Sequence, residues 1–124
     1  MPYINDSIFD GGLTTIASQT NRRIDICYTQ EPTTYTEATS TYTCGNKTGL
    51  SMTAIQNGAT DGRRVDTPAI TDGSVTDTQT AGWWGLTDAS SVLHAAGALS
   101  ATQAVTSGNT FTLDAIQITI RDAA

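Results

Sequence analysis

The sequence has few charged side chains and almost no lysine. Charged residues make up 15% of its 124 residues, against about 25% in typical soluble domains, and Lys47 is the only lysine. The net charge is −6, and most of the basic residues form two pairs, Arg22-Arg23 and Arg63-Arg64. Binding to nucleic acid is therefore not expected, because phosphate contacts need many basic groups on one face. The low charge instead suggests a surface that other subunits cover.

Long hydrophobic runs are also absent. No stretch approaches the roughly 20 apolar residues that a membrane-spanning helix requires. Residues 1–10 lack the positive start and the apolar core of a secretion signal. We therefore expect a protein that is made in the cytoplasm and has no membrane partner.

The side chains on which catalysis and metal binding usually depend are scarce and scattered. His94 is the only histidine, and nothing in the sequence singles out a nucleophile and a carboxylate to partner it. No two His or Cys residues stand at the close spacing of zinc sites. We therefore expect a protein that is not an enzyme, with no cofactor and no catalytic or metal-binding residue, and we interpret His94 as structural.

The two cysteines, Cys27 and Cys44, leave two alternatives open. Disulfides are uncommon in cytoplasmic proteins, and this favours two free thiols. A particle released from a lysed cell would meet an oxidising environment, in which Cys27 and Cys44 can pair. The sequence does not decide between the two.

Threonine is the most abundant residue type, with 24 of the 124 residues. Its β-branched side chain suits a pleated strand, and its hydroxyl can face water or a neighbouring subunit. Alternation of apolar and polar residues from Arg23 to Tyr28 predicts a strand with Ile24 and Ile26 on one face. Further strands are predicted around Met52, Ala54 and Ile55, and over Arg63–Ile70, Ser74–Leu86, Ser91–Leu99 and Thr110–Ile120. Turns are predicted at Asn57-Gly58, Asp61-Gly62, Asp72-Gly73, Asp88-Ala89-Ser90 and Ser107-Gly108-Asn109.

Six to eight strands at this spacing indicate a mainly β fold, a single-domain antiparallel β-sandwich or barrel. The segment Tyr3–Thr20 spaces its apolar residues as an amphipathic helix does, although Gly11-Gly12 interrupts it. We therefore expect a short N-terminal helix, with a helical arm over residues 1–20 and a β domain over residues 21–124. The hydroxyl-rich segment Tyr35–Cys44 is predicted to be an exposed loop with at most one helical turn.

The last predicted strand changes the parity of its apolar residues. Phe111 and Leu113 occupy odd positions, whereas Ile116, Ile118 and Ile120 occupy even ones. A strand cannot change its inward face without an extra residue, so we predict a β-bulge between Asp114 and Ile116. The alternatives are a strand buried on both faces and a strand that crosses between two sheets.

Trp83-Trp84 is the sharpest local feature, because adjacent strand residues point to opposite faces and only one can join the core. The other indole must be shielded from water by local structure, by a neighbouring subunit or by a sugar ring stacked on it. We also expect partner contacts in the segment Tyr3–Ile16 and the loop Glu31–Cys44. The candidate interface residues are Ile4, Ile8, Phe9, Tyr35, Tyr42, Trp83 and Trp84.

Several short motifs extend through most of the chain. They are Gly45-Asn46-Lys47-Thr48, the runs over residues 57–63 and 70–76, Gly97-Ala98-Leu99-Ser100 and the run over residues 104–113. In these motifs the chain resembles a family of small virion proteins of tailed bacteriophages. The resemblance implies a β-rich structural subunit of the virion.

From this resemblance we expect a capsid decoration (cement) protein on the outer surface of the capsid. Its partners would be the major capsid protein and copies of itself, with a trimer favoured because shell lattices offer threefold sites. The alternatives are a tail, neck or fibre component of the same virion, and a carbohydrate-binding or receptor-binding module.

Overall fold

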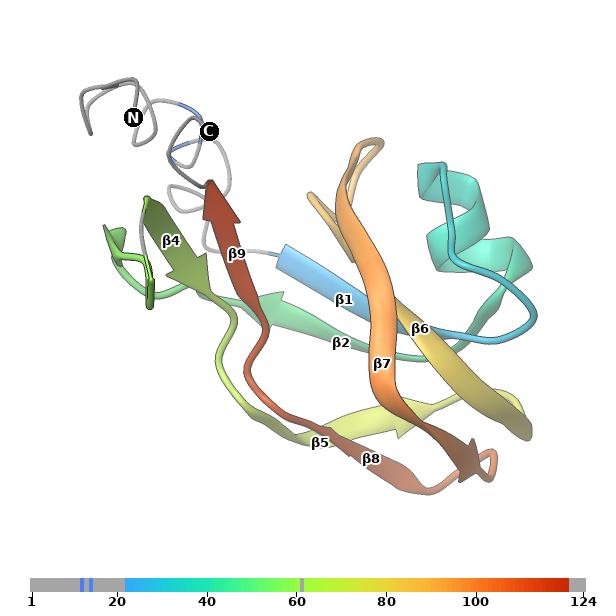
Figure 1. Ribbon diagram of the computed structural model, residues 1–124. Helices are drawn as coiled ribbons and strands as arrows, with labels where there is room; N and C mark the ends of the chain where they lie inside the picture. Colours follow the sequence, from blue (N-terminus) through green and yellow to red (C-terminus); the bar gives the residue numbers. More distant parts are fainter. Residues whose placement is uncertain (1–11, 13, 15–21, 61, 121–124) are drawn as a thin grey trace.

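The computed structural model describes residues 12, 14, 22–60 and 62–120, and in this part of the chain it is mainly β (Figure 1). Strands β1 to β9 form two antiparallel sheets. The six-stranded sheet has the order β7-β6-β1-β2-β5-β8, and the three-stranded sheet has the order β3-β4-β9. The bounds are Arg22–Cys27 for β1, Thr43–Leu50 for β2, Gln56–Asn57 for β3, Arg63–Asp66 for β4, Ile70–Val75 for β5, Gln79–Thr87 for β6, Leu93–Val105 for β7, Thr110–Leu113 for β8 and Gln117–Ile120 for β9.

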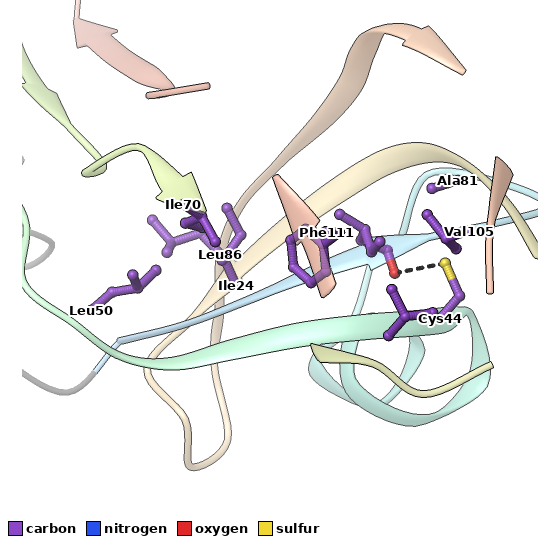
Figure 2. Close-up of a cluster of buried hydrophobic side chains, with 10 residues drawn as sticks. Ile24, Cys44, Leu50, Ile70, Ala81, Leu86, Val105 and Phe111 are labelled. Carbon is purple, nitrogen blue, oxygen red and sulfur yellow. Dashed lines mark hydrogen bonds between the residues drawn. The ribbon is translucent and has the colours of Figure 1, made fainter. Parts of the chain in front are cut away.

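The six-stranded sheet is curled into a half-barrel around its own core. Every one of its strands contributes to a single buried cluster (Figure 2), which consists of Ile24, Ile26, Cys44, Leu50, Ile70, Val75, Ala81, Leu86, Val105 and Phe111. Val105 comes from one edge strand and Phe111 from the other. A flat sheet would hold its two edges far apart, so the shared cluster requires the curl. The predicted mainly β antiparallel fold is confirmed.

Strand β1 shows how the alternating pattern produces this arrangement. Ile24 and Ile26 point to the inner face and are 0% and 3% exposed. Burying one such side chain stabilises the fold by about 1.5–3 kcal/mol. Asp25 and Cys27 point to the outer face, where a short π-helix, η1 (Glu37–Thr41), packs on β1, β2 and β6. The strand predicted over Arg23–Tyr28 is confirmed.

The predicted helix over Tyr3–Thr20 lies almost entirely outside the described residues. Of that segment only Gly12 and Thr14 are described, and both are helical. Among the described residues, no helix reaches the length and apolar character needed to cross a lipid bilayer.

Strand β2 was not predicted, and the strand expected around Met52, Ala54 and Ile55 is wrong. The sequence of β2, Thr-Cys-Gly-Asn-Lys-Thr-Gly-Leu, contains only two apolar side chains, Cys44 and Leu50, and two glycines. Pairing with β1 on one side and β5 on the other holds it in the sheet. Its strand character therefore comes from its neighbours rather than from its own pattern.

The hairpin predicted at Asp72-Gly73 is also wrong, because both residues lie inside β5. Gly73 pairs with Phe111 of β8, and a Cβ at position 73 would overlap the Phe111 ring. Because Gly73 has no side chain, the Phe111 ring can pack into the core at this position, and the glycine does not form a turn. The predicted strand Ser74–Leu86 is accordingly split at residues 76–78, and the predicted strand Arg63–Ile70 is split between β4 and β5.

The last predicted strand crosses between the two sheets, as one of the alternatives stated. Strand β8 belongs to the six-stranded sheet and β9 to the three-stranded sheet. At the crossing, the Thr67 amide donates to the Ile116 carbonyl at 2.9 Å, and the Ile116 amide donates to Thr67 Oγ1 at 2.8 Å. The crossing, and not a bulge within one strand, changes the buried face.

Two predicted turns are confirmed by their geometry. Asp88 Oδ1 accepts the backbone amides of Ser90, Ser91 and Val92 at 2.9–3.0 Å, and Ala89 has a φ of 65°. Gly108, between β7 and β8, has a φ of 90°. Short polar residues and glycine are the residue types that such turns require.

We predict that Gly73→Ala lowers the free energy of unfolding by about 1–3 kcal/mol, because the added methyl group must displace the Phe111 ring. Gly82→Ala is the matched control, since a Cβ at that position meets its nearest atom at an ordinary 3.7 Å. Urea unfolding followed by fluorescence measures both. Equal midpoints for Gly73→Ala and the wild type would contradict this account of the core.

Candidate functional site

The open side of the half-barrel holds a cleft of ≈ 660 Å³. One wall is the middle of β7, and the other is the end of β8 with the segment that leads to β9. The cleft is lined by Trp84, residues 98–103 and residues 112–116. Trp84, Leu99, Leu113 and Ile116 also pack against the core cluster. The cleft therefore lies where the two edges of the curled sheet leave the core incompletely covered.

A large bulge in β7 shapes the first wall of the cleft. Ala81 pairs with Gln103, and Trp83 pairs with Ala98. One residue of β6, Gly82, therefore stands opposite four residues of β7, Leu99–Thr102. Bulges redirect side chains and interrupt the regular ladder of a strand. Gln103, and with it Ser100 and Thr102 within the bulge, line the cleft as a result.

Trp84 reaches the cleft from the inner face of β6. It is half-buried, stands beside Ile26 of β1 and pairs with Gly97 of β7. A Cβ at position 97 would lie 3.0 Å from both Nε1 and Cζ2 of the indole, so the glycine lets the ring lie close against β7. No local pattern in the sequence points to this role of Gly97.

Trp83 lies on the outer face. It pairs with Cys27 of β1, whose thiol contacts the backbone of η1. Tyr35 and Tyr42 border η1 at its two ends, and all three aromatic side chains are half-buried. The structure therefore puts three candidate interface residues around η1 and sends Trp84 to the opposite face. Ile4, Ile8 and Phe9 lie outside the described residues.

The chain between β1 and β2 is less exposed than the sequence suggested. Pro32 and Ala38 are buried in it. A Cβ at Gly85 of β6 would lie 3.0 Å from Ala38 Cβ and 3.2 Å from Pro32 Cγ. The absence of a side chain at position 85 thus allows this loop, residues 30–42, to rest directly on the sheet. We call it the outer loop.

A partly buried ion pair anchors the outer loop to β1. Arg23 donates to both carboxylate oxygens of Asp25, at 2.7 and 2.8 Å, and the Thr43 hydroxyl donates to Asp25 Oδ2 at 2.7 Å. Arg23 Nη2 also donates to the Thr39 carbonyl at 3.3 Å. Burial raises the pKa of the Asp25 carboxyl, and the hydrogen bonds from Arg23 and Thr43 lower it in part. Two-pronged pairing of this kind fixes geometry as well as charge.

His94 has a structural contact that fixes its tautomer. Arg22 Nη1 lies 2.8 Å from His94 Nδ1. Because a guanidinium can only donate, Nδ1 must accept and the ring is neutral with its proton on Nε2. Partial burial, and next the charge of Arg22, lower the pKa of His94.

Cys27 and Cys44 are free thiols in this structure, both buried. Cys27 Sγ lies 3.7 Å from the Ala38 carbonyl on the outer face, and Cys44 Sγ lies 3.4 Å from the Ile26 carbonyl within the core (Figure 2). Burial raises the pKa of Cys27 to about 12 and that of Cys44 to about 11. Both thiols are consequently protonated and poorly nucleophilic at neutral pH.

The cleft lining mixes apolar and polar side chains, and the described part of it contains no cluster of titratable groups. Among the described residues that line the cleft, Asp114 is the only titratable one. Within residues 22–60 and 62–120, no group of three or more His, Cys, Asp or Glu side chains is placed to hold a metal ion. What the lining offers is an indole, hydroxyl groups, an amide and a single carboxylate.

Comparisons of the chain with protein-family models, with curated proteins and with solved structures find no match. The outer loop with Trp83 and the cleft with Trp84 are therefore the two surfaces from which we infer a function.

We predict that neither cysteine reacts with a thiol reagent at pH 8 while the protein is folded. Relative to an ordinary thiol of pKa 9.0, the thiolate fraction is about 1,000-fold lower for Cys27 and about 100-fold lower for Cys44. Colour release from dithiobis-nitrobenzoate should therefore await unfolding in guanidinium. Two thiols titrated rapidly in the native protein, or none after unfolding without reductant, would contradict this assignment.

We also predict that His94 makes stability depend on pH. Its pKa lies below 6.5 in the folded state, so the unfolded chain binds the proton more readily, and stability falls as the pH falls from about 6.5 through the folded pKa. Urea midpoints at pH 7.5 and 5.5 measure the loss. His94→Gln keeps an acceptor for Arg22 without titrating and should show a smaller difference between the two pH values. An unchanged difference would assign the pH dependence to other groups.

Proposed function

We propose that this chain is a non-enzymatic structural subunit of a tailed-bacteriophage virion, and most specifically a capsid decoration protein. It is made in the host cytoplasm and binds the outer surface of the assembled shell. The resemblance described above supports this function, and so does a threonine-rich β fold whose single histidine and two thiols serve as structural groups.

The main support for a docking function is the composition of the outer loop. Its exposed residues are mostly small hydroxyl side chains, namely Thr33, Thr34, Thr36, Ser40 and Thr41. The half-buried Tyr35 and Tyr42 lie at the two ends of η1, and the half-buried Trp83 lies on the same face of the sheet. Aromatic residues are enriched at the cores of protein interfaces.

The anchoring beneath the loop adds to this argument. The Arg23–Asp25 pair and the packing of Ala38 on Gly85 hold the loop in place before any partner arrives. A pre-organised surface loses less conformational entropy on binding than a flexible one. The outer loop is therefore the surface that we assign to the major capsid protein.

Contacts between copies require a surface with few charged side chains, because each copy carries a net charge of −6 and two copies repel each other. From Ala89 to Leu113 the sequence contains no Asp, Glu, Lys or Arg. This uncharged stretch includes all of β7, the turn after it and β8. Two copies can approach along the parts of this stretch that do not line the cleft, residues 89–97 and 104–111, without like-charge repulsion. A trimer at threefold positions of the shell is the arrangement that we propose.

Binding to the assembled shell but not to free capsid subunits would stabilise the shell by mass action. At a free concentration 100 times the dissociation constant, the gain is about 2.7 kcal/mol for each occupied site. No chemical step is required of the decoration protein.

The copy number on purified particles tests the proposal and its closest alternative. Quantitative mass spectrometry should find hundreds of copies per particle if the protein decorates the shell. About six or twelve copies would instead identify a neck or tail component, since those parts are rings that contain few subunits. Its absence from particles would overturn the virion assignment.

We predict that Trp83→Ala and Tyr35→Ala each weaken binding to undecorated shells by at least about tenfold, which corresponds to about 1.4 kcal/mol. Trp84→Phe is the matched control, because it changes the neighbouring indole on the opposite face while keeping the core filled. Co-sedimentation of each variant with shells measures the occupancy. If Trp84→Phe weakens binding as much as Trp83→Ala, the outer loop is not the contact.

A further inference from the structure

The cleft has the size and the mixed lining of a site for a small molecule. Its volume of ≈ 660 Å³ falls within the range of about 300–1,000 Å³ typical of such sites. Apolar side chains form the floor, where Trp84, Leu113 and Ile116 rest on the core cluster. Polar side chains occupy the two walls.

The floor offers an aromatic platform. Trp84 is half-buried, with Gly97 directly against its ring, so neighbouring atoms fix the position of the indole. An indole in a fixed position, apolar in its body and half-exposed, can stack on an apolar surface of a ligand. The C–H face of a sugar ring is a surface of this kind.

The walls offer hydrogen-bonding groups that match hydroxyls. Ser100, Thr102 and Gln103 belong to β7, and Thr112 and Asp114 lie across from them. All five residues are exposed. Hydroxyl and amide groups both donate and accept, whereas a carboxylate accepts strongly. Such a mixture suits a ligand whose own groups both donate and accept.

The charge of the lining selects against ionic ligands. Among residues 22–60 and 62–120, no Lys, Arg or His lines the cleft, so this part of the lining offers no counter-charge to a phosphate or an acidic sugar. The protein as a whole carries a charge of −6 and would repel such anions at a distance. A single indole with a single carboxylate is also far from the aromatic cage that holds a quaternary ammonium. The remaining class is neutral.

The bulge in β7 disfavours an extended peptide as the occupant. Residues 99–102 have no partner residues in β6 and are bent out of the regular ladder. A strand added along this wall would not meet the evenly spaced amide and carbonyl groups that β-pairing requires. The two walls therefore suit side-chain recognition better than main-chain pairing.

We infer that this cleft binds a neutral saccharide, with one sugar ring stacked on Trp84 and its hydroxyls bonded to Gln103, Asp114 and the neighbouring threonines. This activity is separate from docking to the shell, because Trp83 and the outer loop lie on the opposite face. A virion subunit with such a site would attach particles to neutral glycans.

The test uses Trp83→Phe, in which Trp84 is the only tryptophan and so the only source of indole fluorescence. The probes are maltose, cellobiose, lactose and mannobiose as neutral sugars, and sialyllactose and glucose 6-phosphate as anionic ones. A synthetic peptide of residues 93–105 serves as the β-strand probe. We expect a saturable change in Trp84 fluorescence with at least one neutral sugar, confirmed by calorimetry, and binding at least about tenfold weaker for the anionic sugars.

Variants locate the site. Trp84→Ala should abolish binding, and Asp114→Asn and Gln103→Ala should each weaken it about fivefold or more. The latter two side chains are exposed, so their loss should leave the melting temperature unchanged and keep the test valid if Trp84→Ala fails to fold. Asp77→Asn, in the exposed turn between β5 and β6, is the matched control and should bind as the parent does.

Three results would overturn the inference: no neutral sugar binds, Asp77→Asn weakens binding as much as Asp114→Asn does, or the peptide binds while the sugars do not. All measurements use the isolated protein without particles. A failure to find the protein on virions would therefore leave this result standing, and a failure here would leave the docking proposal standing.

Discussion

Phe111 from one edge of the six-stranded sheet and Val105 from the other pack into the same cluster as Ile24 and Ile26 from its middle. This contact exists only while the sheet is curled, and the rest of the structure depends on it. Gly73 makes room for the Phe111 ring. Without that space the β8 edge could not reach the core, and the floor of the cleft would lose Leu113 and Ile116. A sheet that covers its own apolar face by curling needs no second sheet packed on top.

The curl also explains why the two faces differ. The inner face holds the apolar cluster, and the cleft lies where the edge strands β7 and β8 do not pair. The outer face carries Arg23, Asp25 and Cys27, and the outer loop covers them. Trp83 and Trp84 are neighbours in sequence yet serve opposite faces, one beside η1 and the other in the cleft. Docking to a shell and binding of a sugar can therefore occupy one small protein without competing for the same surface.

Local patterns in the sequence predicted what local forces determine. Alternation placed Ile24 and Ile26 inside, and the Asp88 and Gly108 turns followed from their residue types. The change of parity after Leu113 marked the position of the change in buried face, but the predicted bulge was wrong and the crossing from β8 to β9 was only one of its alternatives. The same patterns failed where distant contacts decide the outcome. Strand β2 is held by its neighbours, and Gly73 is explained by a ring 38 positions later in the chain.

The candidate site was predictable only in part. The adjacent tryptophans predicted that one indole would leave the core, but the four-residue bulge of β7 opposite Gly82 has no local signature. Neither does the approach of residues 98–103 to residues 112–116, which the curl brings about. Tyr35 and Tyr42 were named from composition and Trp83 from its adjacency to Trp84, and the partly buried Arg23–Asp25 pair that fixes the loop beneath them was not foreseen.

Amide hydrogen exchange measured by NMR on the isolated protein tests the open half-barrel most directly. The amides of Ile24 and Ile26, in the middle of the curled sheet, should exchange slowest, near the rate set by global unfolding. Those of Leu99–Thr102, opposite Gly82 and beside the cleft, should exchange fastest within β7. Protection of Leu99–Thr102 equal to that of β1 would contradict the account, because it would mean that the sheet is closed where we describe a cleft.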